Sequence, residues 1–243
     1  MAKEFRTPET ITDNPWCPGC GHGIFARLVQ EVLTEKGLLD RNICVNGVGC
    51  SVLCMKSYPL GNLLTCHHGR APSVANAAKR LEPDVCYWCY QGEGDAYSIG
   101  LAETILAAQN DYPITVFVIN NTNYGMTGGQ ASQTTTPGQV TTTTPFGKDG
   151  PALNIIPMIA SIDSVAYVAR GTTASLPEII KLKKYISKAI DVQMNEHKYA
   201  FVEVLSQCPS NWHMNLQQCQ DRILNGLVPN YFPLGEFKGG EKK

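Results

Sequence analysis

Apolar positions follow two periods along the chain, and their alternation predicts an α/β fold. Compact apolar runs typical of buried strands are Asn42–Val48, Asp84–Gln91, Pro113–Asn120, Ser164–Arg170 and Tyr199–Ser206. Apolar residues at helical spacing predict helices at 24–37, Val74–Leu81, Ser98–Asn110, Asn154–Ala160, Leu176–Asn195 and Leu216–Leu227. Strands that alternate with helices favour a mostly parallel sheet with helices on both faces. No repeat or composition break divides residues 1–243, so we expect one domain, with a polar, flexible tail at residues 235–243.

The segment Asp84–Thr127 predicts a strand, a glycine-containing turn, a helix and a second strand. A unit of this length makes the two strands parallel neighbours. Glu93 and Asn121 then lie just past the carboxyl ends of the strands, where open α/β sheets bind ligands, and the helix N-terminus at the same crevice favours a phosphate. Because carboxylate and amide oxygens beside phosphates suit Mg²⁺, the segment predicts a magnesium–diphosphate site. The alternative is an ordinary tight turn followed by a polar strand end.

Ten cysteines in a chain whose first residues show no apolar secretory core favour reduced thiols in the cytoplasm and a metal site. The turn Cys17-Pro-Gly-Cys20 brings two sulfurs to one side of a tight loop. Such a turn is half of a tetrahedral thiolate site for zinc or for an iron–sulfur cluster. A redox pair is the competing interpretation, but that motif normally follows a strand and none is predicted before Cys17.

Other cysteines can complete this thiolate site. Cys50 follows a predicted strand and a glycine pair, and Cys54 is its rival. Cys208 ends another predicted strand and therefore lies at the same sheet edge as Cys50. Cys86 and Cys89 have the spacing of a thiolate pair, but residues three apart in a strand point to opposite faces, so we expect both in the core. Spacing alone does not distinguish zinc from an iron–sulfur cluster, because both accept four thiolates.

Two loops are expected to flank the magnesium site. The run TCHHGRAPS places His68 and Arg70 ahead of a helix, where they can lend positive charge to a diphosphate; a solvated loop with one capping histidine is the alternative. Residues 124–151 form a segment rich in Gly, Thr and Gln, and a loop of this length in a compact domain is usually functional or disordered. We expect its first part to cover the ligand, and its threonine-rich part to be equally compatible with a mobile surface segment.

Two motifs carry a resemblance to a known family. GEGDAYSIG at residues 92–100 and NNTNYGMTGGQAS at residues 120–132 resemble the β subunits of 2-oxoacid:ferredoxin oxidoreductases. The resemblance extends over residues 16–209 and implies a thiamine diphosphate-binding fold.

The resemblance also implies ligands. Mg²⁺ would be bound by the side chains of Glu93 and Asn121 and by the carbonyl of Asn123. The family usually has aspartate at position 93, and because Mg²⁺ tolerates little deviation from octahedral geometry, Asp95 is the alternative ligand. A [4Fe–4S] cluster would be bound by Cys17, Cys20, Cys50 and Cys208. The implied cofactor-binding residues are Cys50, Ser51, His68, Arg70, Gly92, Glu93, Gly94, Asp95, Ala96, Asn121, Asn123, Tyr124, Gly125, Met126 and Thr127.

The activity that the resemblance implies is the oxidative decarboxylation of a 2-oxoacid to acyl-CoA and CO₂, with electrons passed through the cluster to ferredoxin. This chain offers no candidate for the glutamate that activates the cofactor, so we expect a partner α subunit to supply it, alongside further γ and δ ferredoxin-like subunits. Leu53 stands where relatives with acidic substrates can carry lysine, and Met126 is also apolar. Both favour a branched-chain substrate such as 2-oxoisovalerate over 2-oxoglutarate or pyruvate.

Bulk properties exclude some partners and leave two other functional classes. The net charge of −1 and the lack of an apolar run near ~18 residues argue against nucleic acid and membrane as partners. One remaining class is a thiamine-dependent decarboxylase or carboligase with structural zinc. The other is a non-catalytic zinc-binding scaffold, which the departure at Glu93 favours.

Overall fold

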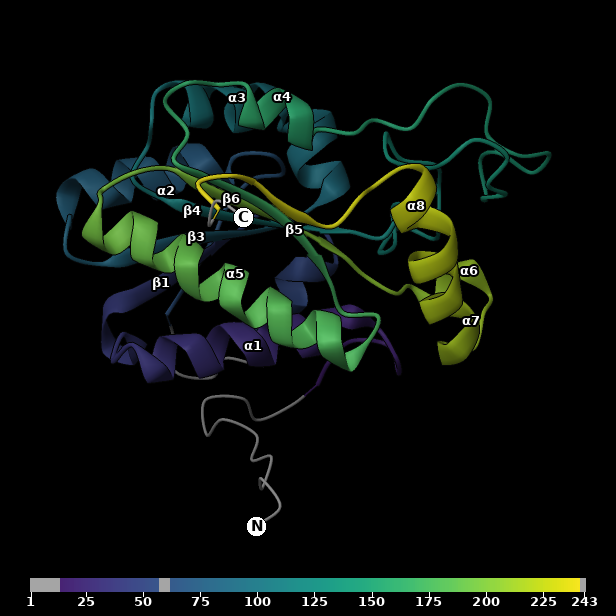
Figure 1. Cartoon of the computed structure of the whole chain (residues 1–243), viewed down its shortest axis with the longest axis horizontal. Helices are drawn as coiled ribbons and strands as arrows, with labels where there is room; N and C mark the ends of the chain where they lie inside the picture. The colour runs from purple at the N-terminus through teal and green to yellow at the C-terminus, as the bar shows by residue number, and fades with distance from the viewer. Residues whose placement is uncertain (1–13, 57–61, 241–243) are drawn as a thin grey trace, which may run out of the picture.

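A seven-stranded sheet organises the computed structural model, which describes residues 14–56 and 62–240 (Figure 1). The strand order across the sheet is β2-β1-β3-β4-β6-β5-β7. The strands are β1 (Asn42–Asn46), β2 (Leu63–Thr65), β3 (Cys86–Gly92), β4 (Thr115–Asn120), β5 (Tyr167–Thr172), β6 (Ala200–Leu205) and β7 (Gly235–Lys238). Paired strands are parallel except for β7, which runs antiparallel to β5. The predicted α/β fold with a mostly parallel sheet is therefore confirmed.

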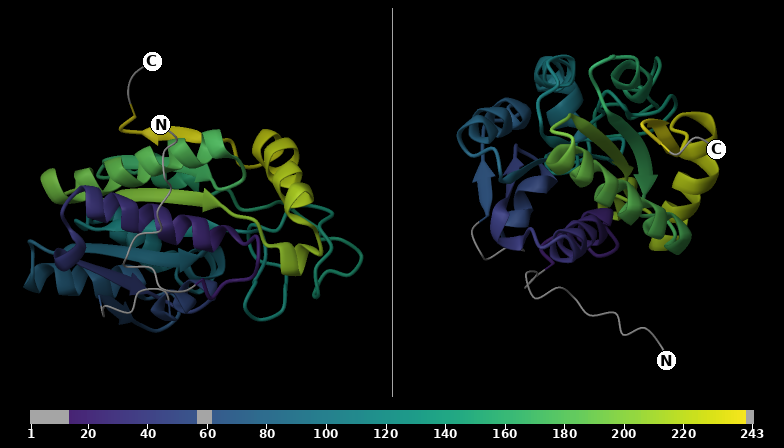
Figure 2. Two further views of the ribbon diagram at one scale, coloured as in Figure 1. Left: turned by 90° about the horizontal axis from the view of Figure 1, so that it is seen from below. Right: turned by 60° about the vertical axis from the view of Figure 1, so that its left-hand side comes forward.

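Helices cover both faces of the sheet. One face packs against α1 (Gly21–Glu35) and α5 (Leu176–Asn195), and the other against α2 (Ala71–Leu81), α3 (Leu101–Gln109) and α4 (Ile156–Ala160) (Figures 1 and 2). A third group of helices lies beyond the carboxyl ends of the strands and consists of α6 (Pro209–Trp212), α7 (Leu216–Asp221), the π-helical η4 (Arg222–Leu227) and α8 (Val228–Asn230). The remaining turns are η1 (Leu39–Arg41), η2 (Cys50–Lys56) and the π-helical η3 (Asp95–Ile99).

Strand β3 shows how the sequence fills two cores. Its residues Cys86–Gln91 are buried, as expected for a parallel strand covered on both faces. Cys86 and Trp88 belong to the core beneath α1 and α5, whereas Tyr87 and Cys89 belong to the core beneath α2 and α3. The prediction that Cys86 and Cys89 are core thiols on opposite faces is confirmed.

The end of the described chain corrects one prediction. Gly235–Lys238, expected to be part of a flexible tail, forms β7. Its polar side chains have fixed partners: Glu236 accepts a hydrogen bond from the hydroxyl of Tyr167 at 2.9 Å, and the Lys238 ammonium donates to the carbonyl of Ile162 at 2.6 Å. The polar residues Glu236 and Lys238 therefore serve to attach this strand to the rest of the fold. Residues 241–243, the rest of the expected tail, lie outside the described part of the chain.

Other differences concern element boundaries. Sequence periodicity missed β2 and the short α6, and two predicted helices begin or end with a π-helical turn, η3 and η4. Residues 1–13, on which the expectation of a cytoplasmic location partly rests, are not described. Within the described ranges, no helix is both long and apolar enough to cross a membrane.

Candidate functional site

A cavity of about 290 Å³ opens at the carboxyl ends of β1, β3 and β4. This is the edge at which open α/β sheets bind ligands, because the loops after parallel strands converge there. The residues that line it are His22, Val48, Gly49, Cys50, His68, Gly92, Glu93, Gly94, Asp95, Ser98, Ile119, Asn121, Asn123, Tyr124, Gly125, Met126 and Thr127. Most of the residues that the sequence singled out are thus brought to one place.

Glu93 is the most unusual group in the cavity wall. It lies on the turn that follows β3, is 3% exposed, and its Oε1 has no hydrogen-bond partner. Burial raises the pKa of this carboxyl to about 8, outweighing the hydrogen bonds from Ser132 and from the backbone that lower it. A buried carboxylate oxygen without a partner is costly unless a cation or a donor from a ligand meets it.

Asp95, the alternative magnesium ligand, is fully engaged with the protein. Its Oδ1 accepts from the backbone N–H of Gly69 at 2.7 Å and of Val48 at 3.3 Å, and also contacts the ring of His68. Its Oδ2 accepts from the side chain of Gln91 at 2.8 Å. The carboxylate therefore fastens the loops after β1 and β2 to the turn after β3. Gly47 is required beside it, because a methyl group there would collide with the Asp95 carboxylate.

The asparagine turn after β4 presents the other predicted ligands. Asn121 and Asn123 are 5% and 2% exposed, and both line the cavity. Thr122 between them has φ +57°, a left-handed conformation that is rare for a β-branched residue. Its N–H donates to Asn120 Oδ1 at 3.1 Å, and the indole N–H of Trp212 donates to the Asn121 carbonyl at 3.0 Å. These two hydrogen bonds stabilise the left-handed conformation at Thr122, and this turn places Asn121 and Asn123 in the cavity wall.

Four cysteines from different parts of the chain lie near one another, and two of them, Cys50 and Cys208, lie next to this turn. Burial raises the pKa of the Cys20 and Cys50 thiols to about 12, and in each case neighbouring thiols, including Cys17 and Cys208, raise it further. A Cβ at Gly125 would lie 3.4 Å from the Cys50 sulfur. The Cys208 sulfur, 7% exposed, accepts from the Asn211 side chain at 3.5 Å. The four thiols are thus in electrostatic range of one another.

The structure separates Cys50 from its rival. Cys54 is fully buried and contacts Cys44, another core thiol, whereas Cys50 lines the cavity. Among the residues that the structure describes, no three histidine, cysteine, aspartate or glutamate side chains lie close enough together to hold one metal ion.

Some predicted site residues lie elsewhere. Arg70 does not line the cavity: its guanidinium pairs with Glu103 on α3 and donates to the Ile99 carbonyl at 3.3 Å, so the neighbouring carboxylate draws it away. Ser51 and Ala96 are fully buried beneath the cavity rather than in its wall. His68 lines the cavity.

The long loop is ordered against the asparagine turn. Tyr124, Met126 and Thr127 from its first part line the cavity, as expected. Further along, the Thr135 hydroxyl and the Gln139 amide donate to the Thr122 carbonyl at 2.7 and 3.0 Å. Beyond these contacts the loop reaches out from the body, where Phe146 is fully exposed (Figure 1).

Sequence reasoning missed His22. Its ring is 2% exposed, stacks on Trp16 with 5.8 Å between centroids, and contacts the Tyr90 hydroxyl through Nδ1 at 2.5 Å. Burial lowers the pKa of His22 to about 3, so the ring is neutral near pH 7. In the sequence, only its position two residues after Cys20 could have pointed to a role for His22. The packing of α1 on β3, which is a tertiary contact, brings the ring to the cavity. Val48, Gly49, Ser98 and Ile119 were also missed.

Comparison with known proteins places this geometry in a family. Residues 47–204 match the model of the thiamine pyrophosphate enzyme C-terminal TPP-binding domain. The solved 2-oxoglutarate:ferredoxin oxidoreductase of Magnetococcus marinus, determined with 2-oxoglutarate, coenzyme A and succinyl-CoA bound, superposes with a TM-score of 0.77 at 24% identity. That match covers 99% of this chain and 87% of the other, and it shows a shared fold.

Curated relatives extend the comparison. A ketoisovalerate oxidoreductase subunit of Methanothermobacter thermautotrophicus is 38% identical over 93% of this chain, which spans about half (48%) of that relative. A 2-oxoglutarate synthase subunit of Methanocaldococcus jannaschii is 35% identical over 92% of this chain and 80% of the relative. A 2-oxoacid:ferredoxin oxidoreductase subunit beta from a Sulfolobus species is 30% identical, with 91% and 71% covered. The chain therefore belongs to the family of thiamine pyrophosphate-binding β subunits of 2-oxoacid:ferredoxin oxidoreductases.

Proposed function

We propose that this chain is the β subunit of an enzyme that oxidatively decarboxylates a 2-oxoacid to acyl-CoA and CO₂ and passes the electrons to ferredoxin. The observation that carries the proposal is the buried, unpartnered carboxyl oxygen of Glu93, which shares a cavity with Asn121 and Asn123 and lies within electrostatic range of the Cys50 and Cys208 thiols. Family membership supports the same conclusion.

The residues at the cavity fit Mg²⁺ and a diphosphate. Glu93 and Asn121 offer side-chain oxygens, and the carbonyl of Asn123 would provide a third ligand. Mg²⁺ prefers oxygen ligands and keeps part of its coordination shell for phosphates, and it would satisfy the orphaned Glu93 oxygen. Asp95 is proposed to brace the loops rather than to bind the ion, because its oxygens already accept hydrogen bonds from the protein.

The cysteines fit an iron–sulfur cluster. Cys17 and Cys20 come from the turn before α1, Cys50 from the start of η2 after β1, and Cys208 from the segment between β6 and α6. The Cys20 and Cys50 thiols lie within electrostatic range of each other and of the other two. Burial and mutual repulsion keep the Cys20 and Cys50 thiols protonated in the absence of a metal, and thiolate ligation would replace their protons with iron.

Each bound group would supply its own chemistry: thiamine diphosphate a nucleophilic carbon for the keto group of the substrate, and the cluster a one-electron acceptor. This chain's residues would bind, orient and shield. The Trp16 indole N–H donates to the Cys50 carbonyl at 2.7 Å and so fixes the ligand loop. His22, neutral near pH 7, adds an uncharged surface to the cavity wall.

A partner subunit is part of the proposal. No described residue of the cavity wall other than Glu93 and Asp95 is a carboxylic acid, and both have other roles here. We therefore propose that an α subunit supplies the activating glutamate, that coenzyme A is a co-substrate, and that γ and δ ferredoxin-like subunits and cytoplasmic ferredoxin carry the electrons onward. The purified chain alone should not reduce a viologen dye with any 2-oxoacid, and turnover by the lone chain would contradict this division.

The proposed substrate is a branched-chain 2-oxoacid. Val48 and Met126 make the cavity mouth apolar and are 44% and 43% exposed, which suits an uncharged side chain. Leu53 packs against the core instead of lining the cavity, so it supports the proposal only indirectly. In the reconstituted complex, 2-oxoisovalerate should have a higher specificity constant than 2-oxoglutarate or pyruvate, and the reverse order would reassign the substrate.

The decisive experiment is cofactor analysis of anaerobically purified protein, alone and with its α partner. About four iron and four sulfide per chain, together with thiamine diphosphate, would fit one cubane cluster and support the proposal. Zinc with thiamine diphosphate would indicate a carboligase or decarboxylase. Zinc without thiamine diphosphate, even with the partner present, would indicate a scaffold subunit and refute the proposed activity.

A further inference from the structure

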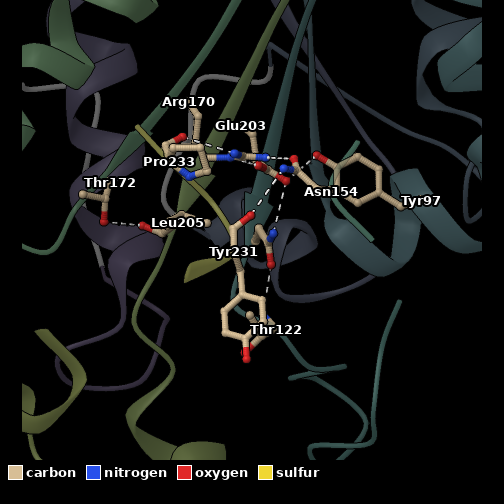
Figure 3. Close-up of polar contacts among 10 residues, drawn as sticks. Tyr97, Thr122, Asn154, Arg170, Thr172, Glu203, Leu205, Tyr231 and Pro233 are labelled. Atoms are coloured by element: carbon tan, nitrogen blue, oxygen red, sulfur yellow. Dashed lines mark hydrogen bonds and ion pairs between the residues drawn. The ribbon is translucent and has the colours of Figure 1, made fainter. Parts of the chain in front are cut away.

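A buried ion pair joins β5 and β6 close to the candidate site. Arg170 and Glu203 are directly opposite each other in the sheet register, and their side chains are 0% and 1% exposed. The Arg170 Nε donates to Glu203 Oε2 (Figure 3). Because the desolvation of two charges offsets much of their attraction, such a pair is a weak source of stability. The other hydrogen bonds that Arg170 and Glu203 make are therefore of more interest than the contribution of the ion pair to stability.

The second oxygen of Glu203 contacts both segments that carry the proposed magnesium ligands. Oε1 accepts from the Tyr97 hydroxyl at 2.9 Å and from the Asn120 side-chain amide at 3.1 Å. Tyr97 belongs to η3, the π-helical turn that begins two residues after Glu93 (Figure 3). Asn120 ends β4 and directly precedes Asn121. One carboxylate on a neighbouring strand thus joins the two halves of the site.

Arg170 fixes the direction in which that carboxylate faces. Its Nη2 donates to Asn154 Oδ1 at 2.6 Å and its Nη1 to the Pro233 carbonyl at 3.2 Å (Figure 3). The guanidinium also lies over the ring of Phe232, 5.3 Å from the centroid. Because these three contacts fix the guanidinium, Glu203 pairs with it through Nε in a single orientation.

The charge of Glu203 in turn sets the orientation of an amide. An ionised carboxylate only accepts hydrogen bonds, so Asn120 must present its NH₂ group to Glu203. Its Oδ1 is then free to accept from the backbone N–H of Thr122 at 3.1 Å. Thr122 has φ +57°, and a β-branched residue in that conformation needs such support. The orientation of one buried amide therefore stabilises the turn that presents Asn121 to the cavity.

We propose that Glu203 is a positioning residue for the magnesium and thiamine diphosphate site, acting through Asn120 and Tyr97; this rests on the proposed function. In a Glu203→Gln variant, the new amide oxygen faces Arg170 and the new NH₂ group faces Asn120. Asn120 must then flip to accept from it, which directs its own NH₂ group at the Thr122 N–H and breaks the turn.

The test measures the thiamine diphosphate dissociation constant of the assembled complex at a fixed, subsaturating Mg²⁺ concentration, together with the thermal unfolding midpoint. Glu203→Gln should weaken cofactor binding about tenfold, the range seen when groups that orient metal ligands are changed. The double variant Asn120→Asp, Glu203→Gln should regain most of the lost affinity, because an aspartate at position 120 accepts from both the glutamine and Thr122. Raising Mg²⁺ should restore kcat in Glu203→Gln, with only the apparent KM for Mg²⁺ changed.

Thr115→Val is the matched control. Thr115 is buried at the opposite end of β4, and its hydroxyl donates to the Ala189 carbonyl at 3.2 Å, so its loss lowers stability without reaching the site. Unchanged affinity in Glu203→Gln, an affinity loss no larger than that of the control, or no recovery in the double variant would each overturn the proposal.

Tyr97→Phe keeps the test decisive if Glu203→Gln does not assemble. This variant retains the ion pair and removes one contact, and it should bind the cofactor several-fold more weakly than Thr115→Val does; equal affinity would overturn the proposal. An unmutated complex that binds no thiamine diphosphate would instead refute the proposed function on which the inference rests.

Discussion

Two carboxylates that stand two residues apart have opposite surroundings at the candidate site. The buried Glu93 Oε1 has no partner, whereas both oxygens of Asp95 accept hydrogen bonds from protein donors. A buried carboxyl oxygen without a partner is a cost that a bound cation removes, and saturated hydrogen bonding is a source of rigidity. Ligand binding, as proposed for Glu93, and structural support, which Asp95 gives through its hydrogen bonds, would therefore be the work of two different carboxylates.

Substitution of each carboxylate should separate these roles. Glu93→Gln should weaken magnesium-dependent thiamine diphosphate binding by about 100-fold, since it removes a charged ligand. Because burial raises the pKa of Glu93 from 4.5 to about 8, the stability of the cofactor-free protein falls as the pH rises from about 4.5 and the loss is complete above about pH 8, so Glu93→Gln should raise the unfolding temperature at neutral and alkaline pH. Asp95→Asn should lower stability by about 2 kcal/mol, because its NH₂ group meets donors, and should affect binding less. Cofactor titration and thermal unfolding of both variants check this, and the opposite ranking for binding would make Asp95 the ligand.

His22 predicts a dependence of stability on pH. Its pKa is about 3 in the folded protein against about 6.5 when unfolded, so the stability of the neutral ring is present above pH 6.5 and is lost as the pH falls toward 3. Between pH 7 and pH 5 this group alone should lower the free energy of unfolding by about 2 kcal/mol. Denaturant unfolding of the chain at the two pH values measures the change, and His22→Gln, which keeps a partner for Tyr90, should reduce it by that amount. An identical pH dependence in both proteins would mean that the ring is accessible to solvent.

At the scale of elements, the turn that carries Cys17 and Cys20 depends on its contact with the end of β6. The N–H of Gly21 donates to the Gln207 carbonyl at 3.4 Å, and a methyl group at Gly21 would collide with the buried Thr173, Ser206 and Gln207 side chains. The Thr173 hydroxyl donates to the Gln207 side chain at 2.6 Å, so neither can move aside freely.

Gly21→Ala should therefore push this turn away from Cys208. We expect a loss of stability of about 2 kcal/mol from overpacking, and loss of iron and sulfide while thiamine diphosphate binding persists. Elemental analysis of the complex measures the change. Gly226→Ala, in η4, has open space around the added methyl group and should retain full iron content. Full iron content in Gly21→Ala would show that the turn does not depend on this contact.

Elements with strong local signals could be predicted from the sequence. The boundaries of α5 match those expected, and β3 and β4 fall within two residues of theirs, because apolar runs and helical spacing are local properties. Strand β7 was missed because its stability comes from partners on β5 and α5 rather than from its own composition. The position of Arg70 outside the cavity wall could not be predicted for a related reason: its guanidinium pairs with Glu103 on α3, and only the tertiary structure shows that contact.

At the scale of the molecule, β7 forms one edge of the sheet and covers β5, the strand that carries Arg170 of the buried Arg170–Glu203 pair. The ring of Phe237 lies 5.8 Å from the Arg170 guanidinium, and Glu236 accepts from Tyr167. An exposed β5 edge would present unpaired backbone groups.

Truncation of the chain tests this closure. A chain that ends before Gly235 should lose about 3 kcal/mol of unfolding free energy, because several hydrogen bonds are removed together. A chain that ends at Lys238 keeps β7 and should unfold like the full-length protein. Denaturant titrations compare the three, and equal stability of all of them would mean that this edge needs no cover.

The order of the strands determines when during synthesis the four thiols can meet. Cys17 leaves the ribosome ahead of β1, but Cys208 follows β6, the sixth of the seven strands within the described ranges. Parallel pairings between distant segments form slowly, and a domain completes its core only when all of its segments are available. Cys17, Cys20 and Cys50 are therefore synthesised well before Cys208, while the sheet is still incomplete. Insertion of the proposed cluster would therefore follow the synthesis of β6 and Cys208, and in the interval before it these cysteines would be most open to oxygen and to other metals.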